Sequence, residues 1–272
     1  MLINQTIENL HILKLAEMAA GLKEQCEQPS YHSLSFEERL GMLVDRELAE
    51  RENRRLARYL KQAHLRADAL IEDVDFRTRR GLERHQLLSL AECAWVRSHH
   101  NVAIVGATGL GKTYLACALA NAAIRRGHSA LYLRGPRLLD ELAIARADGR
   151  SARLLGTFGR VEVLVIDDYL LRPLQVEQAS DVLEVIEDRA GRRSTLVTSQ
   201  LPIAMWHEAT GEPTLADAIC DRLLEHLHRI ELAGQSMRRR SGEHDEAGAR
   251  RGAKQATPPA GQPEPNEASS NG

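Results

Sequence analysis

Residues 101–113 read Asn-Val-Ala-Ile-Val-Gly-Ala-Thr-Gly-Leu-Gly-Lys-Thr, an apolar run that leads directly into a glycine-rich segment. Positions 106–113 match the pattern G-x-x-x-x-G-K-[ST] in full, and residues 114–123 continue as a helical pattern. A strand, a loop and a helix in this order aim backbone N–H groups and the positive end of the helix at bound phosphate. The segment therefore predicts the P-loop of an α/β protein that binds ATP.

The residue types of this loop each have a physical reason. Three glycines permit the tight turns that point N–H groups inward. Lys112 places a positive charge beside the β- and γ-phosphates, and the Thr113 hydroxyl is expected to ligate Mg²⁺. We expect the ATP site to include the whole loop, which consists of Gly106, Ala107, Thr108, Gly109, Leu110, Gly111, Lys112 and Thr113.

A second apolar run ends in two carboxylates. Residues 163–168 read Val-Leu-Val-Ile-Asp-Asp. Charge that follows a buried parallel strand lies at the edge of the sheet where ligands bind. We expect Asp167 to hold Mg²⁺ through water and Asp168 to polarise the attacking water. The alternative is that both acids cap the next helix.

A third apolar run, at 195–198, is followed by Ser199 and Gln200. With the strand order of P-loop ATPases, this strand would lie beside the strand of Asp167. Ser199 or Gln200 would then contact the γ-phosphate or its water. The alternative is an ordinary strand-end turn before Pro202.

Short apolar runs alternate with helical patterns between residues 99 and 240, which predicts a parallel five-stranded sheet flanked by helices. The expected strands are 102–105, 130–133, 161–166, 195–198 and 229–232. The expected helices lie near 112–126, 137–147, 175–190 and 215–227.

Residues 1–98 are expected to form a small helical N-terminal domain that binds DNA or a partner. A capping box from Ser35 to Glu38 opens a helix with an apolar face at Leu40, Leu43, Val44 and Leu48. Residues 241–272 contain several prolines and no large aliphatic residue, so we expect a disordered tail.

A basic run follows that apolar face. Residues 51–66 hold six Arg or Lys and one Glu, a net charge of +5. The run either is a solvated helix face or contacts DNA phosphates without sequence preference. The residues expected at DNA are Arg51, Arg54, Arg55, Arg58 and Lys61. A second basic cluster comprises Arg77, Arg79, Arg80 and Arg84.

Composition argues against several kinds of binding site and against a membrane protein. Aromatic residues make up 4% of the chain, which argues against base stacking as the main mode of nucleic-acid binding. The four cysteines form no C-x-x-C pair, so neither a zinc site nor a disulfide framework is indicated. The adjacent His99 and His100 lack a spaced third ligand. No segment resembles a membrane span, and we expect a cytoplasmic protein.

Several segments together resemble a known family. They are the P-loop, Leu-Val-Ile-Asp-Asp, Val-Thr-Ser-Gln-Leu-Pro, Asp-Ala-Ile-Cys-Asp-Arg-Leu at 217–223 and Gly-Gln-Ser-Met-Arg at 234–238. Residues 1–240 are similar to the IstB family, the ATP-binding helper proteins of insertion sequences. These are AAA+ ATPases and relatives of DnaC-type helicase loaders.

The resemblance implies a protein that binds ATP, assembles as a homo-oligomer on double-stranded DNA and helps the transposase encoded by the same element. It also implies that Gln200 is sensor 1, Arg222 the arginine finger and Arg238 sensor 2. Arg222 could instead form an ion pair with Asp217 or Asp221, and Arg238 could belong to a solvated basic stretch. Asp168 is shorter than the glutamate of most AAA+ ATPases, so hydrolysis is expected to be slow unless DNA or a partner stimulates it.

Two other functions stay open. One is a replicative helicase loader, in which ATP gates delivery of a helicase onto single strands. The other is a nucleotide-gated scaffold that binds ATP without turning it over.

Overall fold

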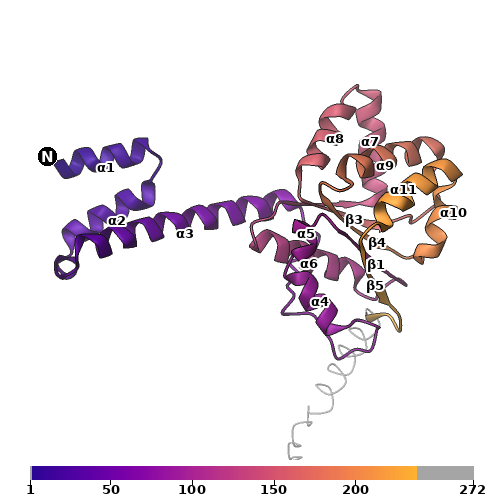
Figure 1. Ribbon diagram of the computed structural model, residues 1–272, viewed down its shortest axis with the longest axis horizontal. Coiled ribbons are helices and arrows are strands. Elements are labelled where there is room, and N and C mark those ends of the chain that lie inside the picture. Colours follow the sequence, from indigo (N-terminus) through magenta and orange to yellow (C-terminus); the bar gives the residue numbers. More distant parts are fainter. Residues whose placement is uncertain (1, 238–272) are drawn as a thin grey trace, which may run out of the picture.

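The computed structural model describes residues 2–237, and a parallel five-stranded sheet forms its centre (Figure 1). The strand order is β2-β3-β4-β1-β5. The strands are β1 (Asn101–Gly106), β2 (Ala130–Arg134), β3 (Val163–Tyr169), β4 (Ser194–Ser199) and β5 (Leu227–Leu232). The predicted α/β fold and the placement of β4 beside β3 are confirmed.

Helices cover both faces of this sheet, because alternate strand residues point to opposite sides. One apolar core lies under the first group of helices and includes Val102 and Ile104, whereas the core on the other face includes Ala103 and Val105. The first face carries α4 (Arg84–Ala91), α5 (Ala94–Arg97) and α6 (Lys112–Arg125). The second carries α7 (Gly135–Ala147), α8 (Ser151–Arg160), α9 (Val176–Arg189), α10 (Trp206–Thr210) and α11 (Pro213–Leu224).

Element boundaries differ from expectation in a few places. β3 runs on to Tyr169, so Asp167 and Asp168 lie within the strand rather than after it. Helices α8 and α10 were not anticipated. Two glycines interrupt the α8 segment, yet its Phe158 is buried in the core, which fixes the helix on the sheet.

The N-terminal part consists of α1 (Leu2–Ile12), α2 (Ala16–Glu27), a 3-10 turn (Pro29–Ser33) and α3 (Phe36–Ala63). The capping box of α3 is confirmed, since Ser35 Oγ accepts from Glu38 N at 3.2 Å and the Glu38 carboxylate accepts from Ser35 N at 2.8 Å. At 1.5 Å per residue the 28 residues of α3 span about 42 Å. Figure 1 shows α3 holding α1 and α2 away from the sheet.

One expectation for this region was wrong, and the apolar face of α3 is covered only in part. Residues 1–98 are not helical throughout, because α3 ends at Ala63 and no helix is assigned from 64 to 83. The end of α3 joins the core beneath α6, because Leu56 and Tyr59 pack against this core and Ala63 lies within it. The apolar face of α3 is not buried as a whole, because only Leu43 is covered, while three of its residues stay about half exposed, namely Leu40, Val44 and Leu48.

No helix within residues 2–237 is long and apolar enough to cross a membrane. Arg238 and the tail expected at 241–272 lie outside the described residues.

Candidate functional site

The loop between β1 and α6 has the backbone that its sequence predicts. Gly106, Gly109 and Gly111 have φ values of 147°, 86° and 86°, a region that favours glycine. Space gives a second reason for glycine. A Cβ on Gly106 would lie 2.3 Å from the carbonyl oxygen of Leu232, and one on Gly109 would lie 2.1 Å from the Oγ of Ser236. The loop therefore fits closely under the segment that follows β5.

The loop opens onto a pocket of about 690 Å³, here called the loop pocket. Lys112 is 6% exposed, and its Nζ donates to the carbonyl oxygen of Ala107 at 3.0 Å. Cationic side chains also enter from outside the loop. The charged and polar residues of its lining include Arg66, Asp73, Asp75, Arg80, Thr108, Lys112, Thr113, Arg134, Asp168 and Gln200. Its four cations outnumber its three carboxylates, which suits a polyphosphate.

Asp167 lies beneath the loop pocket, in contact with Thr113 of its lining. It is fully buried, and it accepts hydrogen bonds from Thr113 Oγ1 at 2.9 and 3.0 Å, Tyr132 OH at 2.6 Å and Thr198 Oγ1 at 2.6 Å. Burial and the adjacent carboxylate raise the pKa of Tyr132, which keeps this phenol protonated as a donor. A threonine hydroxyl beside a carboxylate is a donor set that Mg²⁺ takes together with substrate phosphates. The residues present therefore fit Mg²⁺–ATP.

Asp168 occupies a special backbone position. Its φ is 58°, its N–H donates to Thr198 Oγ1 at 3.0 Å, and its carboxylate accepts from Arg134 Nη2 at 3.1 Å. The alternative of a helix cap does not hold, because the capping box of α9 is formed by Gln175 and Gln178. The Asp168 side chain instead lines the loop pocket.

At the end of β4, the two candidate residues Ser199 and Gln200 make different contacts. Gln200 lines the loop pocket and its Oε1 accepts from Thr108 Oγ1 at 2.8 Å. Ser199 is buried, donates to the carbonyl oxygen of Tyr169 at 2.8 Å and accepts from Leu201 N at 3.1 Å. Ser199 therefore holds the strand-end turn, whereas Gln200 faces the site.

Arg80, from the second basic cluster, contacts the backbone of the P-loop. Arg80 is 3% exposed, and its Nη1 donates to the carbonyl oxygen of Leu110 at 2.7 Å and contacts Met237 Sδ at 2.9 Å. Burial lowers the pKa of this guanidinium. Met237 N donates to the carbonyl oxygen of Gly109 at 2.9 Å, so the chain after β5 crosses the loop just before the position of Arg238.

Sequence reasoning missed five side chains that the fold brings to this site. Thr198 lies within the segment Val-Thr-Ser-Gln-Leu-Pro, but no role was predicted for it there. The other four lie outside the motifs, on β2 or in the irregular segment after α3. The only signal was the polar residues at strand ends and the two basic clusters. The five are Arg66, Arg80, Tyr132, Arg134 and Thr198.

Arg222 lies away from the loop pocket. Its carbonyl oxygen accepts from Asn101 Nδ2 at 3.1 Å, and Asn101 begins β1, at the edge of the sheet opposite the loop. The guanidinium donates to Glu187 Oε1 on α9 at 2.7 Å. The expected ion-pair partners were wrong, because Asp217 contacts His207 and neither Asp217 nor Asp221 pairs with Arg222.

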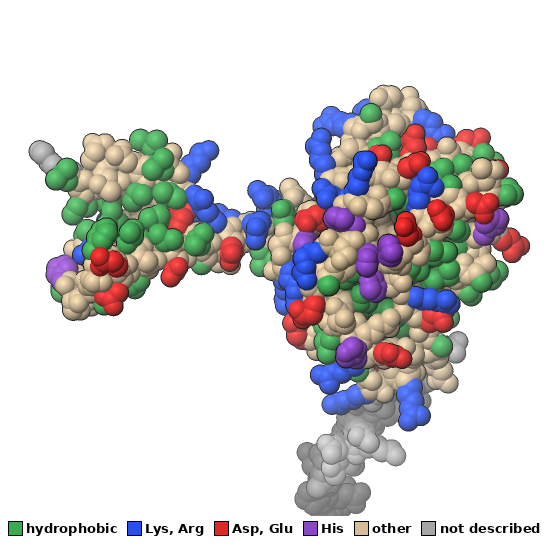
Figure 2. Space-filling view, in the orientation of Figure 1, with side chains coloured by type: hydrophobic (Ala, Val, Ile, Leu, Met, Phe, Trp, Pro, Cys, Tyr) green, Lys and Arg blue, Asp and Glu red, His purple; other side chains and the backbone are tan. Residues whose placement is uncertain are grey.

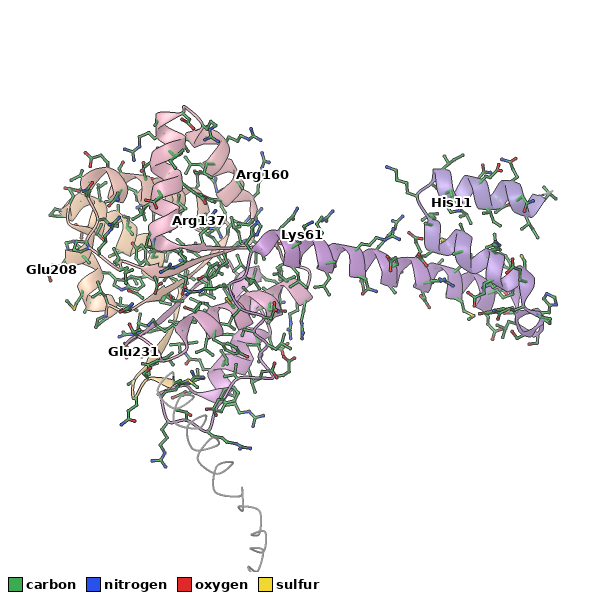
Figure 3. The ribbon with its side chains drawn as sticks, turned by 180° about the vertical axis from the view of Figure 1, so that it is seen from behind. His11, Lys61, Arg137, Arg160, Glu208 and Glu231 are labelled. Carbon is green, nitrogen blue, oxygen red and sulfur yellow. The ribbon has the colours of Figure 1, made fainter. Side chains whose placement is uncertain are left out.

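The basic run on α3 divides into two parts. Arg51 pairs with Glu47 at 2.9 Å and Arg54 with Glu50 at 2.6 Å. Among the described residues no acid pairs with the other three candidates, which are Arg55, Arg58 and Lys61. Figure 2 shows Lys and Arg gathered along α3, and Figure 3 places Lys61 where α3 meets the α/β domain.

Comparison with known proteins agrees with this geometry. The family described as IstB-like ATP binding protein matches residues 8–245. The insertion sequence ATP-binding protein y4pL of Sinorhizobium fredii is 48% identical over 239 residues, which cover 88% of this chain and 98% of that protein.

Two solved structures share the fold. The crystal structure of DnaI has a TM-score of 0.52 at 25% identity and covers 61% of this chain and 92% of its own. The DnaC helicase loader has a TM-score of 0.51 at 19% identity, with 61% and 97% covered. With its P-loop, its strand order and these matches, the chain belongs to the family of IstB-like ATP-binding proteins and has the P-loop AAA+ fold.

Proposed function

We propose that this chain is an ATPase that binds double-stranded DNA as a homo-oligomer and recruits or activates the transposase encoded by the same insertion sequence. The observation that carries the ATPase part is the contact of Thr113 and Thr198 with the buried Asp167, at the floor of a cation-lined pocket. The DNA and transposase parts rest on the family and on the cations of α3.

The residues at the loop pocket have different proposed roles in ATP binding and hydrolysis. Lys112 and the loop N–H groups bind the β- and γ-phosphates, while Thr113 and Asp167 hold Mg²⁺, which neutralises charge on the phosphates. Asp168 orients and polarises the attacking water. Gln200 contacts the γ-phosphate or that water from β4. The sensor 2 role of Arg238 is taken from the family resemblance of the segment Gly-Gln-Ser-Met-Arg.

DNA binding is assigned to the helical N-terminal region 1–98, and within it to the C-terminal part of α3. Arg55, Arg58 and Lys61 are the leading phosphate contacts, because no acid among the described residues neutralises them. Arg51 and Arg54 are secondary, since each is held by a glutamate one turn earlier. Phosphate contacts of this kind carry no sequence preference, which suits a protein that selects varied targets.

A helicase loader is the second candidate, favoured by the likeness to DnaI and DnaC. The two functions differ in the DNA they require. A transposition helper acts on duplex DNA, whereas a loader delivers a helicase onto single strands. The form of DNA that stimulates ATP turnover therefore separates them.

The test is the steady-state ATPase rate of the full chain with no DNA, with duplex DNA and with single-stranded DNA. We expect stimulation by duplex, no turnover in Lys112→Ala, and normal ATP binding without turnover in Asp168→Asn. Stimulation by single strands alone would favour the loader. Tight ATP binding without turnover under every condition would leave only the nucleotide-gated scaffold.

A further inference from the structure

Arg66 lies outside every motif, yet it reaches the centre of the pocket. Its Nη1 is 3.8 Å from Asp167 Oδ2, and its side chain lines the loop pocket together with Lys112 and Thr113. An arginine side chain stays charged at any working pH, so Arg66 places a permanent positive charge beside the proposed metal site.

Arg66 lies in the segment that joins α3 to the sheet, and its side chain is 48% exposed. His64 ends α3 in the left-handed region, with a φ of 49°, and so changes the direction of the chain. Leu65 and Ala67 on either side pack against the core beneath α6. The half-exposed guanidinium therefore lines the loop pocket from a segment that is continuous with α3.

Asp167 does not depend on Arg66 for its hydrogen bonds. Three hydroxyl donors already contact this carboxylate, and Arg66 stands farther away, at 3.8 Å. A cation in that position gains more from a polyanion in the pocket than from a carboxylate that is already satisfied. The proposed Mg²⁺ beside Asp167 would also repel the guanidinium.

We infer that Arg66 leaves Asp167 for the terminal phosphate of a bound nucleoside triphosphate, and that it thereby links the nucleotide state to α3. The inference rests on the proposed function, because it takes the loop pocket to hold Mg²⁺–ATP. Arg66 follows the last residue of α3 by three positions, and the same helix carries Arg55, Arg58 and Lys61. A shift of Arg66 between ATP and ADP is transmitted to the cations proposed to contact DNA.

The first measurement compares the affinities of fluorescent ATP and ADP analogues, without turnover. Arg66→Ala should weaken ATP binding by about 10-fold, or about 1.4 kcal/mol, and change ADP binding by less than about 2-fold. Arg66→Lys, which keeps the charge, should fall between. The matched control is Arg125→Ala, because Arg125 is 46% exposed, pairs with Glu72 at 3.5 Å and lies outside the loop pocket. This variant should bind both nucleotides normally.

The second measurement is amide hydrogen exchange over residues 56–66. The unaltered chain should show slower exchange with a non-hydrolysable ATP analogue than with ADP, and Arg66→Ala should show no difference. Equal loss of ATP and ADP affinity in both Arg66 variants, or a nucleotide response of α3 that survives in Arg66→Ala, would overturn the inference. If the unaltered chain binds no ATP, the proposed function fails together with it.

Discussion

At the residue scale, a buried carboxylate is held by hydroxyl groups from three different elements. Asp167 on β3 meets Thr113 of α6, Tyr132 of β2 and Thr198 of β4. A buried carboxylate without such donors would be costly. These contacts fix the orientation of Asp167 before any ligand arrives, which is the preorganisation that phosphate chemistry requires.

Thr198 is the side chain of this group that contacts both acids. It donates to Asp167 Oδ1 at 2.6 Å and accepts from Asp168 N at 3.0 Å. Thr198→Val keeps the shape but leaves a buried acceptor and a buried N–H short of partners, so we expect a loss of about 1–3 kcal/mol in the free energy of unfolding. Chemical denaturation measures this. Thr198→Ser, which keeps the hydroxyl, should lose clearly less, and equal stability of the two variants would refute the role.

The difference between Thr113 and Thr198 shows what sequence can predict at this scale. The role of Thr113 was predicted because this residue belongs to a motif of eight consecutive residues. Thr198 and Tyr132 become neighbours of Asp167 only through the register of parallel strands, which pairs β2 and β4 with β3. Arg66 and Arg80 come from a segment without regular structure, so no periodicity indicates where their side chains point.

At the element scale, α2 has its N-terminus capped by another helix. No side chain of its own N-terminus caps it. The carboxylate of Glu47, on α3, accepts from Glu17 N at 3.0 Å and from Met18 N at 3.3 Å. The negative charge also faces the positive end of the helix. Arg51 holds the same carboxylate at 2.9 Å, so this arginine serves the packing of the helical unit as well as its surface charge.

The cap predicts a pH dependence for the α2–α3 contact. Burial disfavours ionised Glu47, but hydrogen bonds from Arg51, Met18 and Glu17 outweigh it and hold its pKa below the ordinary value of 4.5. A depressed pKa stabilises the folded form above the unfolded pKa, and this contribution is lost as the pH falls through the folded pKa. Protease cleavage within α2 should therefore accelerate in acid below pH 4.5.

Glu47→Gln tests whether the Glu47 carboxylate causes this pH dependence. The variant should be cleaved faster than the unaltered chain at neutral pH, and its cleavage should accelerate less in acid. Glu37→Gln is a suitable control, because Glu37 is exposed in the first turn of α3. An unchanged pH profile in Glu47→Gln would assign the acid sensitivity to another carboxylate.

The same helix shows why patterns predict an element better than its surroundings. The capping box of α3 was predicted correctly, because its donors and acceptors lie within four residues. Its apolar stripe was equally clear in the sequence, yet Leu40 and Val44 are 41% and 40% exposed. Amphipathic spacing identifies an apolar face but does not say which element covers it.

At the scale of the whole molecule, α3 separates two parts that differ in how many residues they bury. The sheet carries an apolar core on both faces, whereas no residue of α1 is buried. Figure 2 shows hydrophobic side chains over the surface of the helical unit at the far end of α3. The cations of α3 proposed to contact DNA lie at its C-terminal end, next to the sheet (Figure 3).

The salt dependence of duplex DNA binding tests whether the cations of α3 contact DNA. Neutralising Arg55, Arg58 and Lys61 together should flatten the plot of log affinity for duplex DNA against log salt by about 0.9 for each lost phosphate contact. Fluorescence anisotropy over a salt series measures the slope. The pair Arg51→Ala and Arg54→Ala should flatten it less, because these two arginines are already paired with glutamates. If the two sets behave alike, ion pairing on α3 does not decide which cations reach DNA.

The arginine-finger role proposed for Arg222 predicts that ATP turnover depends on assembly. The Arg222 side chain lies outside its own loop pocket, so we expect it to act on ATP held by a neighbouring subunit, where a fixed guanidinium neutralises charge that develops on the γ-phosphoryl oxygens. ATPase activity per subunit should then rise with protein concentration. Lys112→Ala and Arg222→Ala should each be inactive, and mixing them should restore part of the activity, because some interfaces combine an intact loop with an intact Arg222.

Glu187 separates this role from a structural one. If Arg222 only anchors α11 to α9 through its contact with Glu187 Oε1, then Glu187→Gln should impair turnover as much as Arg222→Ala does. If Arg222 acts across the interface, Glu187→Gln should keep most of the activity, because the guanidinium stays available to the neighbouring subunit. A mixture that stays inactive although both variants co-assemble, together with an inactive Glu187→Gln, would make Arg222 a packing residue of its own subunit.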